Sequence, residues 1–397
     1  MITKEDIIKK TKEMDDYLIK TRRFLHENPE VSSKEFKTSE LLKKEIASIG
    51  LEIHPVQGTG FYAILDTGNP GKTVALRTDI DALPIQEQKN NLKQERIVYS
   101  KNDGISHMCG HDGHMAVTLA AAKVLVDLKD QLKGKIIFIF EEGEEIGSGI
   151  HAMVEALKPL NIDAIYGTHL TSFMDTGTIC LDGGPRMAGA VEIDFNVIGK
   201  SGHGSRPDLS INPLFAGANI LNNITSAWAN QLDVGKTVTL GITQFHAGTV
   251  NNVIADKAHI GGSLRYFDVS EGLKALDLIK DVAEKVAAAH KCQIEYTKHT
   301  RIATIPVVND ANLAAIARDG VAEIFPNSLI TDVKWYASES FAHYAKVAPS
   351  VFSFVGIRNE DLGSGAEHHN DYFDLDEAAL PYSLGATLNF VNKYLND

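Results

Sequence analysis

Short apolar segments that alternate with helical segments constrain the fold of this chain more than any other feature. The apolar runs read FYAILDTG, TVALRTD, KIIFIFEE and DAIYGTHL, and turn residues or helical stretches such as MAVTLAAAKVLVDL flank them. Short apolar runs bounded in this way are typical of strands that are buried on both faces. Strands that alternate with helices predict an α/β layer architecture around a largely buried sheet.

The pattern changes in the middle of the chain. The first fifty residues predict two amphipathic helices, the second of which closes at Gly50. From about residue 187, strands such as VEIDFNVIGK and KAHIGGSLRYF accompany two long helical stretches, which indicates a small α+β domain. The α/β pattern resumes afterwards. Because 397 residues are too many for one compact core, we expect a large domain of residues 1–186 and 302–397 and an inserted domain of residues 187–301.

Composition excludes several classes of protein. The formal net charge is −13, which disfavours binding to nucleic acid, because that affinity comes mostly from clustered lysines and arginines. The three cysteines lie far apart and imply no disulfide framework. The charged N-terminus has no apolar core of a signal peptide, and no run approaches the ~20 apolar residues of a membrane helix. We therefore expect a cytoplasmic protein that acts on small molecules, without nucleic-acid or membrane partners.

Metal-ligand chemistry concentrates in the stretch SHMCGHDGHM. Cys109 and His111 are of the residue types that bind zinc-like ions, and Gly110 between them frees the backbone so that both side chains can turn to one point. The alternative is a polar turn before a helix that starts near Gly113, with Asp112 as its N-cap.

Carboxylates and histidines follow other apolar runs. In IFIFEEGEEIGSG, a strand leads directly into two pairs of glutamates, Glu141/Glu142 and Glu144/Glu145. Such a string of glutamates is most often a charged segment exposed to solvent. Adjacent carboxylates can also provide a metal ligand and a general base. His169 ends another apolar run, and His368 and His369 lie in the late segment GAEHHNDYF. Together these groups supply what a hydrolase with two metal ions needs.

The ordered set of motifs resembles a known family. The motifs are ALRTDIDALPIQE, SHMCGHDGHMA, the glutamate pair, GTHL, GKSGHGSRP, GTVNNVIAD and HHNDYFDLDEAAL. The chain resembles the aminoacylase/carboxypeptidase-like metallohydrolases, in the branch of hippurate hydrolases, auxin-conjugate hydrolases and N-acyl-amino-acid amidohydrolases. The resemblance implies a three-layer α/β catalytic domain of the zinc-peptidase type with a mixed sheet. It also implies an inserted α+β lid domain that often dimerises, and hence a homodimer or higher homo-oligomer.

The resemblance also implies roles for individual residues. Two divalent ions (Zn, Mn, Co or Ni) would be held by Cys109, His111, Glu145, His169 and His369, with Glu144 as the general base. His369 is preferred to His368 because the family places this ligand four residues before a phenylalanine, here Phe373. Arg77, Asp79 and Asp81 would orient the ligands, or would form no more than a turn at a strand end.

Three residues of the inserted domain would contact the substrate. His203 would polarise the scissile carbonyl, and in the family this histidine can come from a neighbouring subunit, while Asn252 and Arg265 would hold the substrate carboxylate. A solvated strand position is the alternative for Arg265. The chain departs from the family pattern at EEGEEIGSG, where the choice between Glu141/Glu142 and Glu144/Glu145 depends on spacing and we favour the second pair. The segments SESF (Ser338–Phe341) and SGHG (Ser201–Gly204) also depart from the family pattern, and these departures bear on substrate preference.

The leading hypothesis is metal-assisted hydrolysis of N-acyl amino acids such as N-acetyl or N-benzoyl derivatives. Glu144 would take a proton from a metal-activated water and pass it to the leaving amine. The alternatives are a metallo-dipeptidase or carboxypeptidase acting on small peptides, a catalytically silent binding protein of the same fold, and a thiol nucleophile at Cys109.

Overall fold

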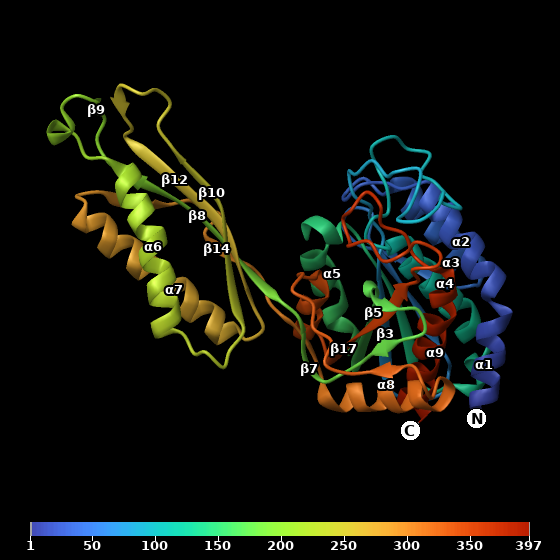
Figure 1. Ribbon diagram of the computed structural model, residues 1–397. Helices are drawn as coiled ribbons and strands as arrows, with labels where there is room; N and C mark the ends of the chain where they lie inside the picture. Colours follow the sequence, from blue (N-terminus) through green and yellow to red (C-terminus); the bar gives the residue numbers. More distant parts are fainter. Residues whose placement is uncertain (1, 397) are drawn as a thin grey trace. The chain divides into compact units, whose positions relative to one another are not determined.

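The computed structural model describes residues 2–396, which form two compact units. The first contains the residues up to Gly184, Val308–Val333 and those from His343 onwards, and the second contains Pro185–Val307 and Lys334–Ala342. The boundaries thus lie at 185 and 307, beside the expected 187 and 301, and a short later segment also belongs to the second unit. Each unit is described here by itself (Figure 1).

Three helices open the first unit. They are α1 (Lys4–Glu13), α2 (Asp15–Glu27) and α3 (Phe36–Ser48). Thr3 and Asp6 form a reciprocal capping box at the start of α1, which satisfies backbone N–H groups that the first turn leaves free. The single amphipathic helix expected before α3 is divided at Met14, which ends α1 and precedes α2.

A mixed sheet forms the centre of the first unit, in the strand order β1-β2-β4-β3-β5-β17-β6-β16. The strands are β1 (Glu52–Pro55), β2 (Phe61–Asp66), β3 (Thr73–Asp79), β4 (Lys135–Glu141), β5 (Ala164–Asp175), β6 (Ile179–Cys180), β16 (Leu329–Ile330) and β17 (Ser350–Arg358). The four central strands β4, β3, β5 and β17 are parallel, whereas β2 pairs antiparallel with β4. The carboxyl ends of the parallel strands therefore meet at one edge, where a ligand site is expected.

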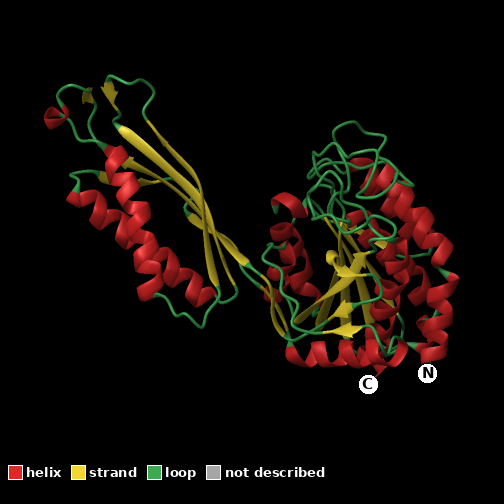
Figure 2. Ribbon diagram, viewed as in Figure 1, coloured by secondary structure: helices red, strands yellow, loops and turns green. Residues whose placement is uncertain are grey.

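Helices cover both faces of this sheet, which gives the three layers that the family resemblance implied (Figure 2). They are α4 (His111–Asp127), α5 (Ile150–Leu157), α8 (Ala311–Ile324) and α9 (Leu380–Asn396), together with α1–α3. Helices α4 and α9 pack on each other and on β3, and α5 lies at the opposite face. Because both faces are covered, β3, β4 and β17 are buried along almost their whole length.

The second unit is an antiparallel sheet with two helices on one face. Its sheet contains β10 (Val238–Ala247), β12 (Lys257–Tyr266), β8 (Gly189–Ile198), β13 (Gln293–Tyr296) and β14 (Arg301–Thr304). Alternate residues of β8 are buried against α6 (Pro213–Gln231) and α7 (Val269–Ala289), which form a separate apolar core. The short strands β9 (Gly202–His203) and β11 (Val253–Ile254) also belong to this unit, whereas β7 (Gly184–Met187) and β15 (Val307–Asn309) span the boundaries between the two units.

Each part of the expected fold class is therefore present: a helix-covered mixed sheet and an inserted α+β unit. Among the described helices, none combines the length and apolarity that crossing a membrane requires.

Candidate metal centre

Cys109 and His111 lie where a loop becomes the buried helix α4. Gly110 between them adopts a left-handed conformation, with φ of 85°, which glycine reaches without the strain that a Cβ would cause. His111 is the first residue of α4, and both side chains are buried. The helix thus begins at His111 with Gly110 as its N-cap, and Asp112 lies inside it, so the N-cap at Asp112 that the alternative reading gave is wrong.

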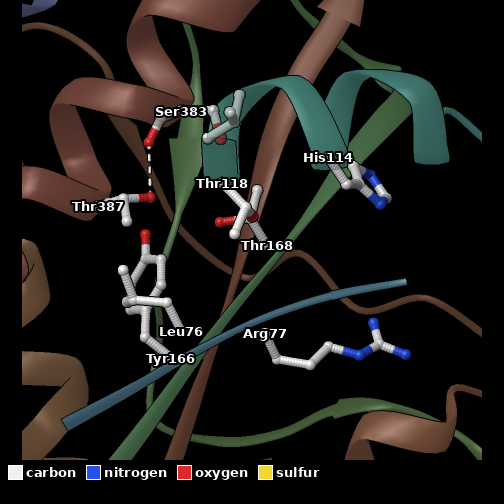
Figure 3. Close-up of a pocket in the computed structure, with 9 residues that line it drawn as sticks. Leu76, Arg77, His114, Thr118, Tyr166, Thr168, Ser383 and Thr387 are labelled. Carbon is white, nitrogen blue, oxygen red and sulfur yellow. Dashed lines mark hydrogen bonds between the residues drawn. The ribbon is translucent and has the colours of Figure 1, made fainter. Parts of the chain in front are cut away.

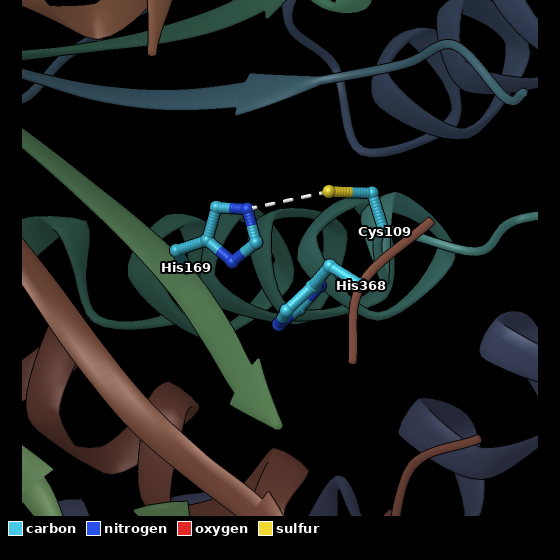
Figure 4. A group of neighbouring side chains, drawn as sticks. All are labelled: Cys109, His169 and His368. Carbon is cyan, nitrogen blue, oxygen red and sulfur yellow. Dashed lines mark hydrogen bonds between the residues drawn. The ribbon is translucent and has the colours of Figure 1, made fainter. Parts of the chain in front are cut away.

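The thiol of Cys109 faces two histidines from distant parts of the chain. Cys109 Sγ lies 3.6 Å from His169 Nε2, and His169 Nδ1 donates to the carbonyl of Leu170 at 2.8 Å. That hydrogen bond fixes the tautomer which presents Nε2 as a ligand, as is usual for metal-bound histidines. Cys109, His169 and His368 offer three ligand atoms within 4.8 Å of one another (Figure 4).

Glu145 forms a second group with the start of α4. Its Oε1 lies 3.8 Å from His111 Nε2, and its Oε2 lies 3.2 Å from His369 Nε2. Cys109, His111 and Glu145 again offer ligand atoms within 4.8 Å of one another. Cys109 thus belongs to both groups.

The structure places the two adjacent histidines differently. His368 lies with Cys109 and His169, and its Nε2 accepts a hydrogen bond from the backbone N–H of Ser172 at 3.1 Å. His369 is half exposed and adjoins Glu145. The assignment of the metal ligand to His369 therefore stays a prediction.

These groups fit divalent metal ions. His111 Nε2 and Glu145 Oε1 are inaccessible to solvent, and neither has a hydrogen-bond partner among the described residues. Burying such atoms without a partner costs free energy, which a coordinated cation would recover. A mixture of thiolate, imidazole and carboxylate ligands suits zinc and neighbouring transition metals.

Burial also argues against a thiol nucleophile. Burial and the negative charge of Glu145 raise the pKa of the Cys109 thiol well above its usual value. Reactive cysteines have the opposite property, because the thiolate is the nucleophile. The Cys109 thiol would lose its proton readily only beside a bound cation.

Two aspartates at the end of β3 and just after it hold the histidines of α4. Asp81 accepts from His111 Nδ1 through its side chain at 3.2 Å and through its carbonyl at 2.9 Å, and its Oδ2 accepts the backbone N–H of Glu145 at 3.1 Å. Asp79 binds His114 Nδ1 at 2.8 Å and Arg77 at 2.9 Å. Although burial opposes the effect, His111, His114 and Arg77 hold the pKa of Asp79 well below its usual range, so it is charged.

Two of the remaining polar residues of SHMCGHDGHM, His114 and Asp112, support the scaffold. His114 accepts the backbone N–H of Leu170 at 2.9 Å. Asp112 pairs at 2.8 Å with both Arg22 and His26 of α2, which fastens α4 to that helix. His107 is buried. Only Cys109 and His111 of this stretch face Glu145.

A small internal cavity lies behind the site (Figure 3). His114 and Arg77 line it together with the hydroxyl groups of Thr118, Tyr166, Thr168, Ser383 and Thr387. A small cavity with this lining suits water molecules and not an apolar acyl group.

The four glutamates of EEGEE point in different directions. Glu141 accepts hydrogen bonds from Arg77 and from the hydroxyl of Tyr344, both at 2.8 Å, and Glu142 accepts the backbone N–H of Thr59 at 2.8 Å. Both carboxylates thus have hydrogen-bond partners outside the two groups of candidate ligands. Glu144 and Glu145 are partly exposed and lie on a 3₁₀ turn, Glu144–Ile146, that brings Glu145 to His111.

The predicted substrate residues belong to the second unit. The structure brings His203 and Asn252 together, because β9 pairs with β11 and Gly204 donates to the carbonyl of Asn252 at 2.8 Å. Arg265 of β12 is half-buried and donates to the hydroxyl of Ser338 at 2.6 Å. Among the described residues no carboxylate forms an ion pair with this guanidinium.

Sequence reasoning missed the support that comes from the segment before α3. Glu35, Ser32 and Ser33 contact the turn of Glu144 and Glu145 or its neighbour Asp81. The segment carries no metal-ligand pattern or periodicity that points to this role, and it lies more than one hundred residues away from that turn.

Comparison with known proteins identifies relatives over nearly the whole chain. Residues 75–392 match the family described as Peptidase family M20/M25/M40. A thermostable carboxypeptidase 2 of Saccharolobus solfataricus is 33% identical over 94% of each chain, and an N-acetylcysteine deacetylase of Bacillus subtilis is 32% identical over 91% of this chain and 93% of its own. The crystal structure of the Bacillus subtilis YXEP protein, described as a dinuclear metal binding peptidase, has a TM-score of 0.83 and 30% identity, covering 97% of this chain and 99% of that one. The family resemblance is thus confirmed: the chain belongs to peptidase family M20/M25/M40 and is a metal-dependent hydrolase.

Proposed function

We propose that this enzyme hydrolyses the amide bond of N-acyl amino acids, with two divalent ions held by Cys109, His111, Glu145, His169 and His369. The observation that carries the proposal is the pair Glu144–Glu145. Glu145 lies between two histidines, 3.8 Å from His111 and 3.2 Å from His369, while the adjacent Glu144 shares its 3₁₀ turn. One carboxylate can thus bind a cation while its neighbour handles a proton.

The chain's own residues would carry the reaction as follows. Divalent ions bound at these ligands lower the pKa of a water molecule and polarise a carbonyl. Glu144 accepts the proton of the attacking water and returns it to the nitrogen of the leaving amine. Asp81 keeps Glu145 and His111 in place through the hydrogen bonds described above.

Arg265 supports a substrate that carries a carboxylate. The half-buried guanidinium of Arg265 donates to the hydroxyl of Ser338 and retains further N–H donors for an anion. Arginine binds carboxylates through two parallel hydrogen bonds. His203 and Asn252 remain predicted substrate contacts, His203 to the carbonyl oxygen and Asn252 to the carboxylate.

The replacement Glu144→Gln tests the base. Gln keeps the shape of the side chain but cannot accept the proton, so kcat should fall by about 10²- to 10⁴-fold while metal content stays at the wild-type level. The measurement is single-turnover and steady-state hydrolysis of N-acetyl and N-benzoyl amino acids by chelator-stripped enzyme reloaded with Zn, Mn, Co or Ni. Full activity of this variant would show that another group is the base.

The second candidate is a dipeptidase or carboxypeptidase, which the similarity to the Saccharolobus carboxypeptidase favours. The same panel separates the two functions. Cleavage of Ala-Ala dipeptides without cleavage of any N-acetyl or N-benzoyl amino acid would favour the peptidase. Absence of amide hydrolysis with every metal would favour a binding protein.

A further inference from the structure

The turn that carries Glu144 and Glu145 rests on the residues just before α3. The backbone N–H of Gly143 donates to Glu35 Oε1 at 2.9 Å, and the hydroxyls of Ser33 and Ser148 lie 2.7 Å apart. Ser32 donates to Asp81 Oδ2 at 2.6 Å, the same oxygen that accepts the N–H of Glu145. Three side chains of one segment thus support both ends and the middle of this turn, which we call the Glu144 turn (Gly143–Ser148).

The Glu144 turn has little structure of its own to hold it. It is a single 3₁₀ turn between two glycines in the left-handed region, Gly143 with φ of 60° and Gly147 with φ of 63°. A Cβ on Gly143 would overlap the hydroxyl of Ser148. Because 3₁₀ hydrogen bonds have poorer geometry than those of an α-helix, such a turn depends on outside contacts for its orientation.

Burying the carboxyl group of Glu35 at this place costs free energy of folding. Its side chain is fully buried, and within residues 2–396 no cation forms an ion pair with it. Its other oxygen, Oε2, accepts from the hydroxyl of Thr59 at 2.9 Å. Burial, reinforced by the charge of Asp81, raises the pKa of Glu35 to about 7. Apolar packing alone would be met at lower cost by leucine or methionine.

We propose that Glu35 is a positioning residue for catalysis, which holds the N–H of Gly143 and thereby aims Glu144 at the reacting water and Glu145 at its metal ion. The inference rests on the proposed role of Glu144 as the base. A displacement of the turn by about 1 Å would be costly, because catalysis of this kind depends on geometry at that scale.

Matched replacements of Glu35 test the proposal. Glu35→Met and Glu35→Leu keep an apolar volume but remove the acceptor for Gly143, whereas Glu35→Gln keeps an amide oxygen that can accept the same hydrogen bond. We expect kcat of the Met and Leu variants to fall on the order of 10- to 100-fold, with KM and metal content close to wild type. Glu35→Gln should restore most of kcat.

Thr59→Val is the control. It removes the hydrogen bond at the other oxygen of the same carboxylate and destabilises the same region, but it leaves the Gly143 contact in place. If Glu35 only stabilises the fold, Thr59→Val and Glu35→Met will lower the melting temperature and will leave kcat per folded, metal-loaded enzyme unchanged, which overturns the proposal. Equal losses of kcat in both would also overturn it.

Amide hydrogen exchange gives a readout that needs no substrate. In metal-loaded Glu35→Met, peptides that cover the Glu144 turn should exchange faster than in wild type, in Glu35→Gln and in Thr59→Val. Unchanged exchange would overturn the positioning role. If no N-acyl amino acid is cleaved even by the wild type, the proposed function fails, yet faster exchange confined to the Met and Leu variants would still support the contact.

Discussion

Three carboxylates of one short segment point toward different partners. Glu141, Glu142 and Glu145 are within five residues of one another, yet Arg77 and Tyr344 bind the first, the backbone of Thr59 binds the second, and His111 and His369 flank the third. Spacing in the sequence favoured the pair Glu144/Glu145 but could not exclude Glu141/Glu142. Arg77 lies 64 positions from Glu141, and Thr59 lies 83 positions from Glu142, so a local sequence pattern could not predict these contacts.

Metal binding should distinguish these carboxylates. We expect Glu145→Gln to lose metal on dialysis, because an amide is a weaker ligand than a carboxylate for these ions. Glu142→Gln should retain its metal, because its amide oxygen can still accept from the N–H of Thr59. Metal content measured by atomic emission after matched dialysis checks this. The reverse order would assign the ligand to the Glu141/Glu142 pair.

At the scale of single elements, the start of α3 makes stability depend on pH. The pKa of Glu35 is raised from an ordinary 4.5 to about 7, mainly by burial, so the folded state holds this proton more tightly than the unfolded state. Protonation of Glu35 thus favours folding at acid pH, and this contribution is lost as pH rises through about 7.

The expected size of this effect is up to about 3 kcal/mol between pH 4.5 and pH 8. Glu35→Gln cannot titrate, so its free energy of unfolding should decline less over this range than that of the wild type. Urea unfolding of both proteins at each pH gives the difference and cancels the contribution of groups that do not interact with Glu35. Parallel pH profiles would show that Glu35 titrates normally.

The boundaries of the helices and strands show how far local sequence patterns predict the structure. Buried strands such as β3 and β4 and the long helices were predictable from apolar runs and helical spacing, because burial on one or two faces imposes those patterns. The break at Met14 and the start of α4 at His111 were not. At α4, Asp112 pairs with Arg22 and His26 and lies within the helix, not at the N-cap that the alternative reading gave it.

At the scale of the whole molecule, the two units have separate apolar cores and all candidate metal ligands belong to the first. Both tryptophans, Trp228 and Trp335, belong to the second. A ligand that binds only the folded first unit stabilises that unit, by about 4 kcal/mol when its concentration is 1,000 times its Kd.

Removal of the metal should therefore lower the unfolding temperature of the first unit and leave that of the second unit unchanged. With a chelator, the thermal transition seen by far-ultraviolet circular dichroism should shift to lower temperature, while the midpoint reported by tryptophan fluorescence stays in place. Addition of metal in excess of the chelator is the control. A matching shift of the fluorescence midpoint would mean that the two units unfold together.

The family resemblance, the α/β class and the inserted α+β unit were predictable from sequence, because ordered motifs and a change of periodicity along the chain carry that information. The return of residues 334–342 to the second unit was not, because no composition change marks it. The roles of Ser32, Ser33 and Glu35 were equally hidden, since they exist only as contacts between segments far apart in the chain.

The position of β17 beside β5 has a consequence for biosynthesis. Ser172 of β5 and the ring of His368 that it contacts are 196 positions apart in the chain. At ribosomal rates of about 5–20 residues per second, the interval between their synthesis is roughly 10 to 40 s. During that time β5 lacks its partner β17, and Cys109 and His169 lack the histidine that lies beside them in the folded enzyme. The predicted ligand His369 follows Cys109 by 260 residues, so the proposed metal site can be completed only after this late segment has been synthesised.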